Sequence, residues 1–368
     1  MKITDIEIRM CRHQETGMKD SEMRDGKKSD LEFLVITFHT DEGLSSSTFG
    51  FAGRGAAMAG EIANTIFKPF FIGRDPLYRE KHWHEYRTAD RWWNHAPIYS
   101  YGPFDINCWL LSSMKAEQPL YKYLGAYRDS VPIYGSSLVL NSPDDYAKEA
   151  IKYKNRGFNA YKLHPPGDYD FDLEAHKEVR KVVGDKFKLM SDPVAPYTFE
   201  QALRFGRELE KLNYYWYEEP LFDENFHNLR ELTRILDIPI VGTEVIAKHP
   251  YSVAECISTR VVDVVRADPS WSGGITATMK TAHLAESFGV SCEIHTAIYH
   301  PLELVNLHCC AAIKNCEFFE VLLPYDLFNF GLKESINIKE GYAQLPNKPG
   351  LGIDLDWDFI DNTTFKKL

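Results

Sequence analysis

The sequence has no pair of cysteines in the CxxC spacing, no GxGxxG turn, and no apolar run of the roughly 18 residues that a membrane span needs. These absences argue against a zinc or redox motif of paired cysteines, a dinucleotide fold and a membrane protein. An excess of basic residues is also lacking: the formal net charge is −11, whereas binding to nucleic acid needs a clustered basic surface. The seven cysteines fall mostly in apolar runs, so we interpret them as reduced core residues of a cytoplasmic protein.

The first part of the chain, about residues 1–125, differs in pattern from the rest. The segments MKITDIEIRM (1–10) and LEFLVITFHT (31–40) alternate apolar and polar residues, which is typical of half-buried strands. The polar stretch from His13 to Asp30 predicts a long loop, and SSSTFGFAGRGAA (45–57) predicts a second flexible segment. Helical patterns follow at about 60–89 and 103–124. We therefore expect a separate α+β domain here.

From about residue 130 onward, short apolar runs alternate with amphipathic helical stretches. There are eight such runs: VPIYGSS, FNAYKLH, KFKLMSDP, YYWYEEP, IPIVGTE, VDVVRAD, VSCEIHT and FFEVLL. The alternation implies parallel βαβ units, and eight units are the number that a closed (β/α)₈ TIM-like barrel requires. A doubly wound open sheet is the main competing fold. We predict an α/β protein with a capping domain at 1–125, a barrel at 126–325, and a C-terminal segment at 326–368 that returns to the capping domain.

Ionisable residues recur at the end of these apolar runs. From Asp192 onward, the gaps between successive positions are 26, 26, 24, 27 and 25 residues, close to the length of one βα unit in a barrel of about 250 residues. Parallel strands place all their carboxyl ends on one face, which is where the active sites of such barrels lie. The recurring positions are Lys162 with His164, then Asp192, Glu218, Glu244, Asp268, His295 and Glu320.

Three of these residues, Asp192, Glu218 and Glu244, are carboxylates on neighbouring strands. Neither Cys nor His interrupts the set, and Zn²⁺ more often takes such ligands. An all-oxygen set suits a hard cation, and Mg²⁺ in octahedral coordination keeps positions open for water or substrate. The sequence therefore predicts one Mg²⁺ per chain.

Possible proton-transfer groups flank this predicted metal site on both sides. Lys162 and His164 are two residues apart on one strand, so their side chains point to the same face. His295 lies on the strand next to Asp268, which favours a pair in which the carboxylate orients the imidazole. A base beside a metal suits removal of a proton α to a carboxylate, with the metal stabilising the enediolate.

These motifs together resemble the enolase superfamily and, within it, the mandelate racemase subgroup, whose members use a Lys or His base with Mg²⁺. The resemblance covers essentially the whole chain. It implies that Glu218 rather than Glu219 is the ligand, that Asp268 and His295 form a catalytic dyad, and that Glu320 hydrogen-bonds a substrate oxygen. The motifs that carry it are SD(192)P, YE(218)EP, GTE(244), RAD(268)PSWSGGIT, EIH(295)T and Glu320 after the eighth run.

Three positions depart from the pattern of the family. The second strand ends Lys162-Leu163-His164 where racemases usually have Lys-x-Lys, and an imidazole titrates nearer pH 7 than an amine. Val194 stands where Asn is common, and Trp271 stands where Lys is usual. In the family two capping loops set specificity, and they match His13–Asp30 and Ser45–Ala57. Candidate substrate-binding residues are therefore Lys19, Arg24 and Arg54, with Tyr99 lining the site or belonging to the core.

The expected function is that of an acid-sugar dehydratase, a lyase that converts an aldonate or aldarate to a 2-keto-3-deoxy acid. His295, poised by Asp268, and His164, near Lys162, share abstraction of the α-proton and protonation of the leaving hydroxyl. The configuration at C2 of the substrate decides which is the base. A racemase, epimerase or lactone cycloisomerase with the same chemistry is the alternative, and a non-catalytic carboxylate-binding barrel is a remote one. We expect a small carboxylate as the partner, no nucleic acid or membrane, and a homo-oligomer.

Overall fold

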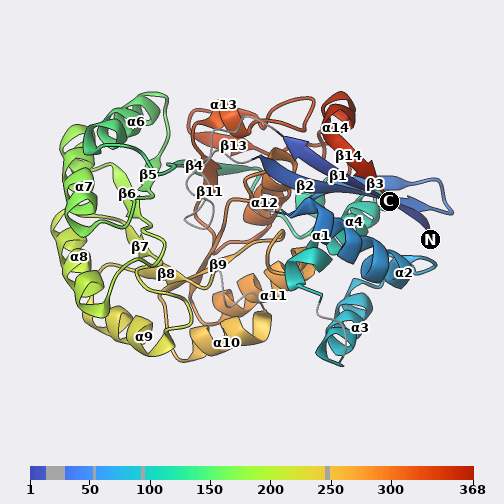
Figure 1. Ribbon diagram of the computed structural model, residues 1–368, viewed down its shortest axis with the longest axis horizontal. Helices are drawn as coiled ribbons and strands as arrows, with labels where there is room; N and C mark the ends of the chain where they lie inside the picture. Colours follow the sequence, from blue (N-terminus) through green and yellow to red (C-terminus); the bar gives the residue numbers. More distant parts are fainter. Residues whose placement is uncertain (14–29, 53–54, 93–95, 245–248) are drawn as a thin grey trace.

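A four-stranded antiparallel sheet forms the framework of the N-terminal domain in the computed structural model, which describes residues 1–13, 30–52, 55–92, 96–244 and 249–368. Strands β1 and β2 pair from Ile3 opposite Thr40 to His13 opposite Leu31. The C-terminal strand β14 pairs with β1 and lies at the edge of the same sheet (Figure 1). The predicted completion of the capping domain by the C-terminal segment is therefore confirmed. In spatial order the strands are β14 (Thr364–Lys367), β1 (Ile3–His13), β2 (Leu31–Thr40) and β3 (Ser45–Phe51).

The prediction of a flexible segment at 45–57 is wrong for most of its length. Ser45–Phe51 forms β3, which pairs with β2 along its whole length. The serines are compatible with a strand here because their hydroxyls find partners: Ser47 Oγ lies 2.8 Å from Thr37 Oγ1, and Ser46 donates to Asn107 over 2.8 Å. Pairing with a neighbouring strand has overridden the loop-like composition.

Helices pack against one face of this sheet, and α4 lies between the sheet and the barrel (Figure 1). Helix α4 begins at Ile98, so the predicted start near Pro103 is wrong, and that proline lies inside the helix. The aromatic and aliphatic residues of β1, β2, α3 and α4 form a core of their own, to which Tyr101 belongs. The helices are α1 (Ala56–Ile62), the π-helix η2 (Ala63–Phe67), α2 (Lys68–Phe71), α3 (Arg79–Trp92), α4 (Ile98–Lys115) and α5 (Leu120–Tyr123).

Eight parallel strands in sequential order make up the barrel, and the last strand, β11, pairs with the first, β4. This order excludes the doubly wound open sheet and confirms the predicted fold class. The strands are β4 (Ser130–Ser136), β5 (Ala160–Leu163), β6 (Lys188–Ser191), β7 (Trp216–Glu218), β8 (Ile240–Gly242), β9 (Val264–Ala267), β10 (Ser291–Ile294) and β11 (Phe319–Leu322).

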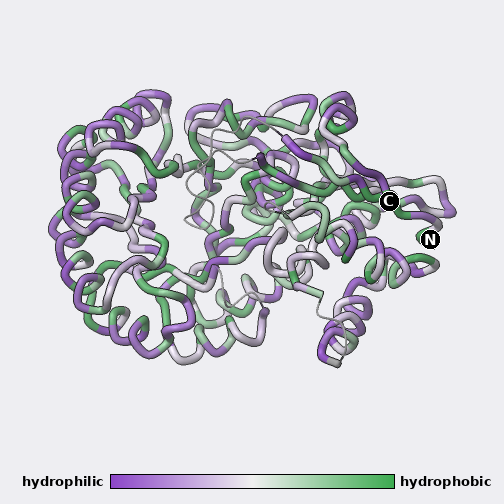
Figure 2. The backbone as a smooth tube through the Cα atoms, in the orientation of Figure 1, coloured by the Kyte–Doolittle hydropathy of each residue, from purple (hydrophilic) through white to green (hydrophobic). Residues whose placement is uncertain are grey.

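Amphipathic helices surround the strands and bury one face against them. Figure 2 shows hydrophilic and hydrophobic stretches alternating along the outer helices. In α8, for example, Ala202, Phe205 and Leu209 are buried at a helical spacing, and a capping box at Thr198 and Gln201 starts the helix. The barrel helices are α6 (Pro143–Asn155), α7 (Tyr169–Val183), α8 (Phe199–Lys211), α9 (Phe226–Ile235), α10 (Pro250–Ser258), α11 (Gly274–Ser287) and α12 (His300–Ala312).

The seam between β10 and β11 is joined by a side chain. No strand ladder joins these two strands in the part of the chain that the structure describes. Instead, the buried Glu293 carboxylate accepts hydrogen bonds from the backbone N–H groups of Glu317 at 2.7 Å and Phe318 at 3.2 Å. These bonds satisfy amides that a ladder would otherwise use.

The C-terminal segment contacts both domains. Strands β12 (Ile338–Lys339) and β13 (Tyr342–Gln344) form an antiparallel hairpin, and β13 also pairs with the first residues of β4. The chain then reaches β14 beside β1. Its helices are α13 (Tyr325–Phe328) and α14 (Trp357–Thr363). Among the described residues, no helix combines the length and the apolar character needed to cross a bilayer.

Candidate active site

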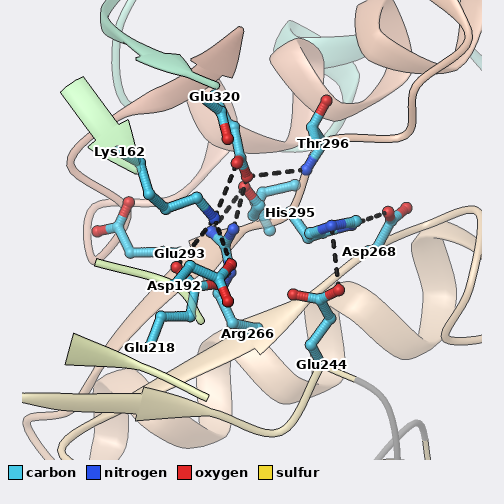
Figure 3. Close-up of polar contacts among 12 residues, drawn as sticks. Lys162, Asp192, Glu218, Glu244, Arg266, Asp268, Glu293, His295, Thr296 and Glu320 are labelled. Carbon is cyan, nitrogen blue, oxygen red and sulfur yellow. Dashed lines mark hydrogen bonds and ion pairs between the residues drawn. The ribbon is translucent and has the colours of Figure 1, made fainter. Parts of the chain in front are cut away.

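The recurring ionisable residues meet at the carboxyl ends of the barrel strands. Each one lies within its strand or within two residues after its end, and the parallel topology brings them together at one side of the barrel. Figure 3 shows the side chains of Lys162, Asp192, Glu218, Glu244, Asp268, His295 and Glu320 converging from separate strands. The predicted residues brought together here are Lys162, His164, Asp192, Glu218, Glu244, Asp268, His295 and Glu320.

One oxygen atom from each of Asp192, Glu218 and Glu244 lies within 4.8 Å of the other two. We call these three residues the carboxylate triad. Asp192 and Glu218 are buried and Glu244 is half-buried, so one side of the set faces the open end of the barrel. Three negative oxygens at this separation, without nitrogen or sulfur, are the donor set that a hard divalent cation prefers.

Two buried cations lie beneath the triad. Lys162 Nζ lies 3.1 Å from Asp192 Oδ2, 3.0 Å from Glu218 Oε2 and 2.9 Å from Glu320 Oε1. Burial by itself lowers the pKa of Lys162, but Glu218 and Glu320 outweigh it, and the net shift is well upward. Lys162 is therefore a fixed positive charge in this site rather than a neutral base.

The second cation is Arg266, which the sequence reasoning missed. Its Nε lies 2.6 Å from Glu218 Oε1 and its Nη2 lies 2.5 Å from Glu320 Oε2. Arg266 precedes Asp268 by two residues on one strand, the same relation that placed Lys162 beside His164, so the alternation of side chains was the available signal. Burial opposes ionisation of Glu320, yet Lys162 and Arg266 hold its pKa well below the ordinary value.

His164 approaches the triad from one side. Its Nδ1–H donates to the carbonyl oxygen of Ser137 over 2.7 Å, and its Nε2 lies 3.0 Å from Asp192 Oδ2. These partners assign the free nitrogen of the neutral ring to Nε2, facing the triad. Burial lowers the pKa of His164, but the Asp192 carboxylate outweighs it and the net shift is upward.

His295 approaches the triad from the other side. Its Nδ1–H donates to Asp268 Oδ2 over 3.0 Å, and its Nε2 lies 3.1 Å from Glu244 Oε1. Asp268 is itself held by Ser270, whose amide and hydroxyl donate to Oδ1 over 2.7 Å and 2.6 Å. Against the effect of burial, Glu244 and Asp268 raise the pKa of His295 to about 9. Both imidazoles thus have Nδ1 anchored outside the triad and Nε2 turned toward it.

Burial also separates the behaviour of neighbouring acids. It raises the pKa of Glu244 to about 7, with nearby Glu218 adding to the effect of burial and His295 opposing it. It raises the pKa of Glu219 well above the ordinary value, with Glu244 as the next cause. Of the two acids of the EEP motif, Glu218 is the one whose oxygen belongs to the carboxylate triad.

A chain of aromatic contacts leads from the capping domain to His295. The ring of Tyr99 lies 6.5 Å from that of Phe51, Phe51 lies 5.2 Å from Trp271, and Trp271 lies 4.7 Å from the His295 imidazole. The position of Tyr99 is therefore compatible with the predicted wall of the site. The other predicted substrate-binding residues, Lys19, Arg24 and Arg54, lie outside the described residues.

The family model described as Enolase C-terminal domain-like matches residues 145–359. The chain belongs to the enolase superfamily. An arabinonate dehydratase of Saccharolobus solfataricus is 31% identical over 316 residues, which cover 82% of this chain and 84% of that protein. A D-glucarate dehydratase from Agrobacterium tumefaciens, solved in complex with magnesium, is 32% identical, with a TM-score of 0.89 and 100% of both chains covered. A 3,6-anhydro-alpha-L-galactonate cycloisomerase of Streptomyces coelicolor is 25% identical over 348 residues, or 90% of this chain and 91% of that protein.

In this enolase-superfamily enzyme, backbone strain gathers at the strand ends that carry the site. Val194, Thr243 and Ile298 have φ angles of 60, 75 and 69 degrees, a left-handed conformation that is a genuine outlier for β-branched residues. They follow Asp192, precede Glu244 and follow His295, respectively. Strain of this kind costs about 1–3 kcal/mol per residue and persists only where the surroundings impose it.

Proposed function

We propose that the chain removes the proton α to a carboxylate and dehydrates an acid sugar, an aldonate or aldarate, to a 2-keto-3-deoxy acid. The observation that carries the proposal is the pair of imidazoles whose Nε2 atoms face one carboxylate triad from two sides, through Asp192 and Glu244. Dehydration needs one group to take the α-proton and another to protonate the hydroxyl that leaves. Two anchored imidazoles on either side of one site supply both groups.

The roles follow from the partners of each side chain. His295 is oriented by Asp268, which also stabilises its charged form after it takes a proton. His164 is oriented by the Ser137 carbonyl and gives or takes its proton at Nε2. Whether His164 or His295 is the base depends on the configuration at C2. Lys162 supplies fixed positive charge, and we keep for Glu320 the hydrogen bond to a substrate oxygen that the resemblance implies.

The triad residues Asp192, Glu218 and Glu244 would hold one Mg²⁺, which their all-oxygen donor set fits. When bound, the ion supplies positive charge for the substrate carboxylate and for the enediolate that forms from it. Beneath the ion, the buried side chains of Lys162 and Arg266 exclude water. On its two sides, the imidazoles of His164 and His295 face the carboxylate triad.

A racemase, epimerase or lactone cycloisomerase is the second candidate, because two imidazoles on opposite sides also suit proton removal from one face and return to the other. We test between the two with Mg²⁺, a library of aldonic and aldaric acids, and D₂O. Formation of 2-keto-3-deoxy products is the expected result, whereas deuterium at the α-carbon without loss of water identifies the second candidate. A folded protein that binds a carboxylate ligand but turns over no substrate would identify a non-catalytic barrel.

Single substitutions of the two imidazoles give the sharper test. His164→Asn and His295→Asn each reduce turnover by at least the roughly 10²-fold expected for loss of a general acid or base. His176→Asn controls for the change of side chain. His176 is a buried histidine outside the site, and it hydrogen-bonds to Ser191 and to the carbonyl of Asp172. Equal activity of all three variants would contradict the assignment.

We also propose that the small carboxylate substrate is the main partner and that the chain forms a homo-oligomer in the cytoplasm. The domain limits 1–125, 126–325 and 326–368 belong to the same proposal. Light scattering of the purified protein tests the oligomeric state, and limited proteolysis tests the domain limits.

A further inference from the structure

Glu303 is a buried carboxylic acid that the proposed mechanism does not use. It lies in the first turn of α12 and is 7% exposed. One oxygen, Oε1, accepts a hydrogen bond from Thr296 Oγ1 and another, over 2.8 Å, from the backbone N–H of Ile298. Acids are rarely buried unless they are paired or hydrogen-bonded. The hydrogen bonds of Glu303 go to a loop beside His295, so its role is in the structure of that loop rather than in solubility.

The loop that Glu303 holds is the one that follows the catalytic strand β10. Ile298 has a φ of 69 degrees, so this loop is held in a conformation that a β-branched residue avoids. Asn306, one turn further along α12, donates to the carbonyl oxygen of His295 over 2.6 Å. Two side chains from one face of α12 therefore fix the loop from His295 to Ile298.

The same loop also contacts Glu320 of β11. The backbone N–H of Thr296 donates to Glu320 Oε2 over 3.1 Å, and Figure 3 shows this contact next to His295. Glu320 Oε2 also receives Arg266 Nη2 at 2.5 Å. A shift of Thr296 would thus disturb His295 through the backbone and Glu320 through the lost hydrogen bond.

A small cavity of about 20 Å³ adjoins Glu303 and Glu320 and is also lined by His300 and Tyr325. This volume is that of about one water molecule, and most of the lining is apolar. The second oxygen of Glu303, Oε2, is buried and has no hydrogen-bond partner among the described residues. Because an unpartnered buried oxygen is costly, a residue that served only for packing would not carry a carboxyl group here. Burial raises the pKa of Glu303 to about 8, against the opposing effect of the hydrogen bond from Thr296.

We propose that Glu303 is a positioning residue: it holds Thr296 and Ile298 so that the Thr296 amide stays on Glu320 and His295 stays between Asp268 and the carboxylate triad. This inference rests on the proposed function for its kinetic consequence, but its structural consequence is independent of any substrate. A displacement of about 1 Å of catalytic groups costs on the order of 10²-fold in rate. The effect should therefore fall on kcat rather than on KM.

The test compares Glu303→Gln, which keeps the Oε1 acceptor in neutral form, with Glu303→Ala, which removes it. We expect Glu303→Ala to lower kcat by about 10²-fold with KM changed less than about threefold, and Glu303→Gln to restore most of kcat. Glu149→Gln and Glu149→Ala are matched controls, because Glu149 is a partly buried acid in α6 whose Oε1 accepts from Tyr161. They should leave kcat unchanged.

Hydrogen exchange of the peptide that covers 295–299 provides a readout that needs no turnover. Faster exchange in Glu303→Ala, but not in Glu303→Gln, supports the proposal even if no acid sugar is a substrate. If Glu303→Ala does not fold, Thr296→Val removes one of the two donors and should show the same loss of kcat, with Thr296→Ser as the rescue. Unchanged exchange and kcat in folded Glu303→Ala, or a loss in Glu303→Gln as large as in Glu303→Ala, would overturn the proposal.

Discussion

Arg266→Met tests the electrostatic account of the site most directly. The substitution removes the charge of a fully buried side chain while keeping an unbranched apolar stem. Its contacts are short, 2.6 Å from Nε to Glu218 Oε1 and 2.5 Å from Nη2 to Glu320 Oε2, and both carboxylates are at most 1% exposed. The variant therefore leaves both carboxylates with Lys162 as the remaining cationic side chain of the described residues that contacts both of them, 3.0 Å from Glu218 Oε2 and 2.9 Å from Glu320 Oε1.

The magnitude follows from the depth of these contacts. At an effective dielectric constant of about 20, each contact contributes about 6 kcal/mol of attraction before the desolvation of the charges is subtracted. Desolvation cancels much of this gain, and removal of one partner from a buried pair costs about 3–5 kcal/mol. We expect the free energy of unfolding of Arg266→Met to fall by about this amount at pH 8.

The pH dependence of the loss identifies its cause. The pKa of Glu320 in the folded wild type is well below its ordinary value, because Lys162 and Arg266 outweigh the effect of burial. Its stabilising contribution is therefore present above the ordinary pKa of about 4.3 and is lost as the pH falls through the folded value. Without Arg266 the folded pKa rises, so Glu320 binds a proton at a higher pH. The difference between variant and wild type should shrink between pH 8 and pH 5.

Urea denaturation at these two pH values measures the effect, with Arg180→Met as the matched control. Arg180 is also buried, but its donors go to the backbone carbonyls of residues such as Leu212 and Asn213 rather than to acids. Its substitution should destabilise the protein with little change between pH 8 and pH 5. A loss below about 1 kcal/mol in Arg266→Met, or a loss as independent of pH as the control, would refute the reasoning.

Three further predictions concern the metal, the strain and a buried histidine. Mg²⁺ at about 100 times its Kd should raise the free energy of unfolding by about 2.7 kcal/mol, as measured by thermal denaturation. Asp192→Asn should abolish this gain. An equal gain in the variant would contradict the assignment of the carboxylate triad as the metal site. Val194→Asn should raise stability by about 1 kcal/mol, since Val194 is 58% exposed with a φ of 60 degrees. Urea denaturation measures this change, and Val139→Asn is the control, because Val139 is 60% exposed and has no positive φ. An equal gain in stability from Val139→Asn would refute the claim that Val194 is strained. Burial lowers the pKa of His176 to about 4, so its stabilising contribution is complete above about pH 6.5 and falls by about 2 kcal/mol on going to pH 5. His176→Asn should flatten the thermal stability of the protein between these pH values, and an unchanged slope contradicts this assignment.

The strand-end residues were predictable because the barrel repeats its own geometry along the chain. An acid such as Asp192 or Glu218 ends an apolar run, and the interval of 26 residues between them matches one βα unit. The same local pattern gave the fold class and placed His164 beside Lys162. Each of these predictions depends only on a residue and its neighbours along the chain.

Partners from distant segments were not predictable in this way. Ser45–Phe51 has the composition of a loop and forms a strand because β2 offers it a complete set of backbone partners. The alternation of side chains on β9 points Arg266 to the same face as Asp268, but its ion pairs depend on Glu218 and Glu320, which lie on other strands. Glu303 lies in an apolar helix, where the sequence gives no reason to connect it with Thr296.

Contacts from outside the barrel strands explain how the dyad keeps its geometry. The buried Asp105 of α4 accepts hydrogen bonds from the amide and hydroxyl of Thr276, at 2.9 Å and 2.6 Å, and so caps the first turn of α11 from the capping domain. Gly274 has a φ of 91 degrees, and a Cβ there would lie 2.3 Å from Asp105 Oδ2, so only glycine permits this approach. The turn from Asp268 to Gly274 is thereby fixed by the capping domain, while α12 fixes the loop after His295. Beyond the pairing of β9 with β10, the two members of the dyad, 3.0 Å apart, are thus supported by different elements: the capping domain on the side of Asp268 and α12 on the side of His295.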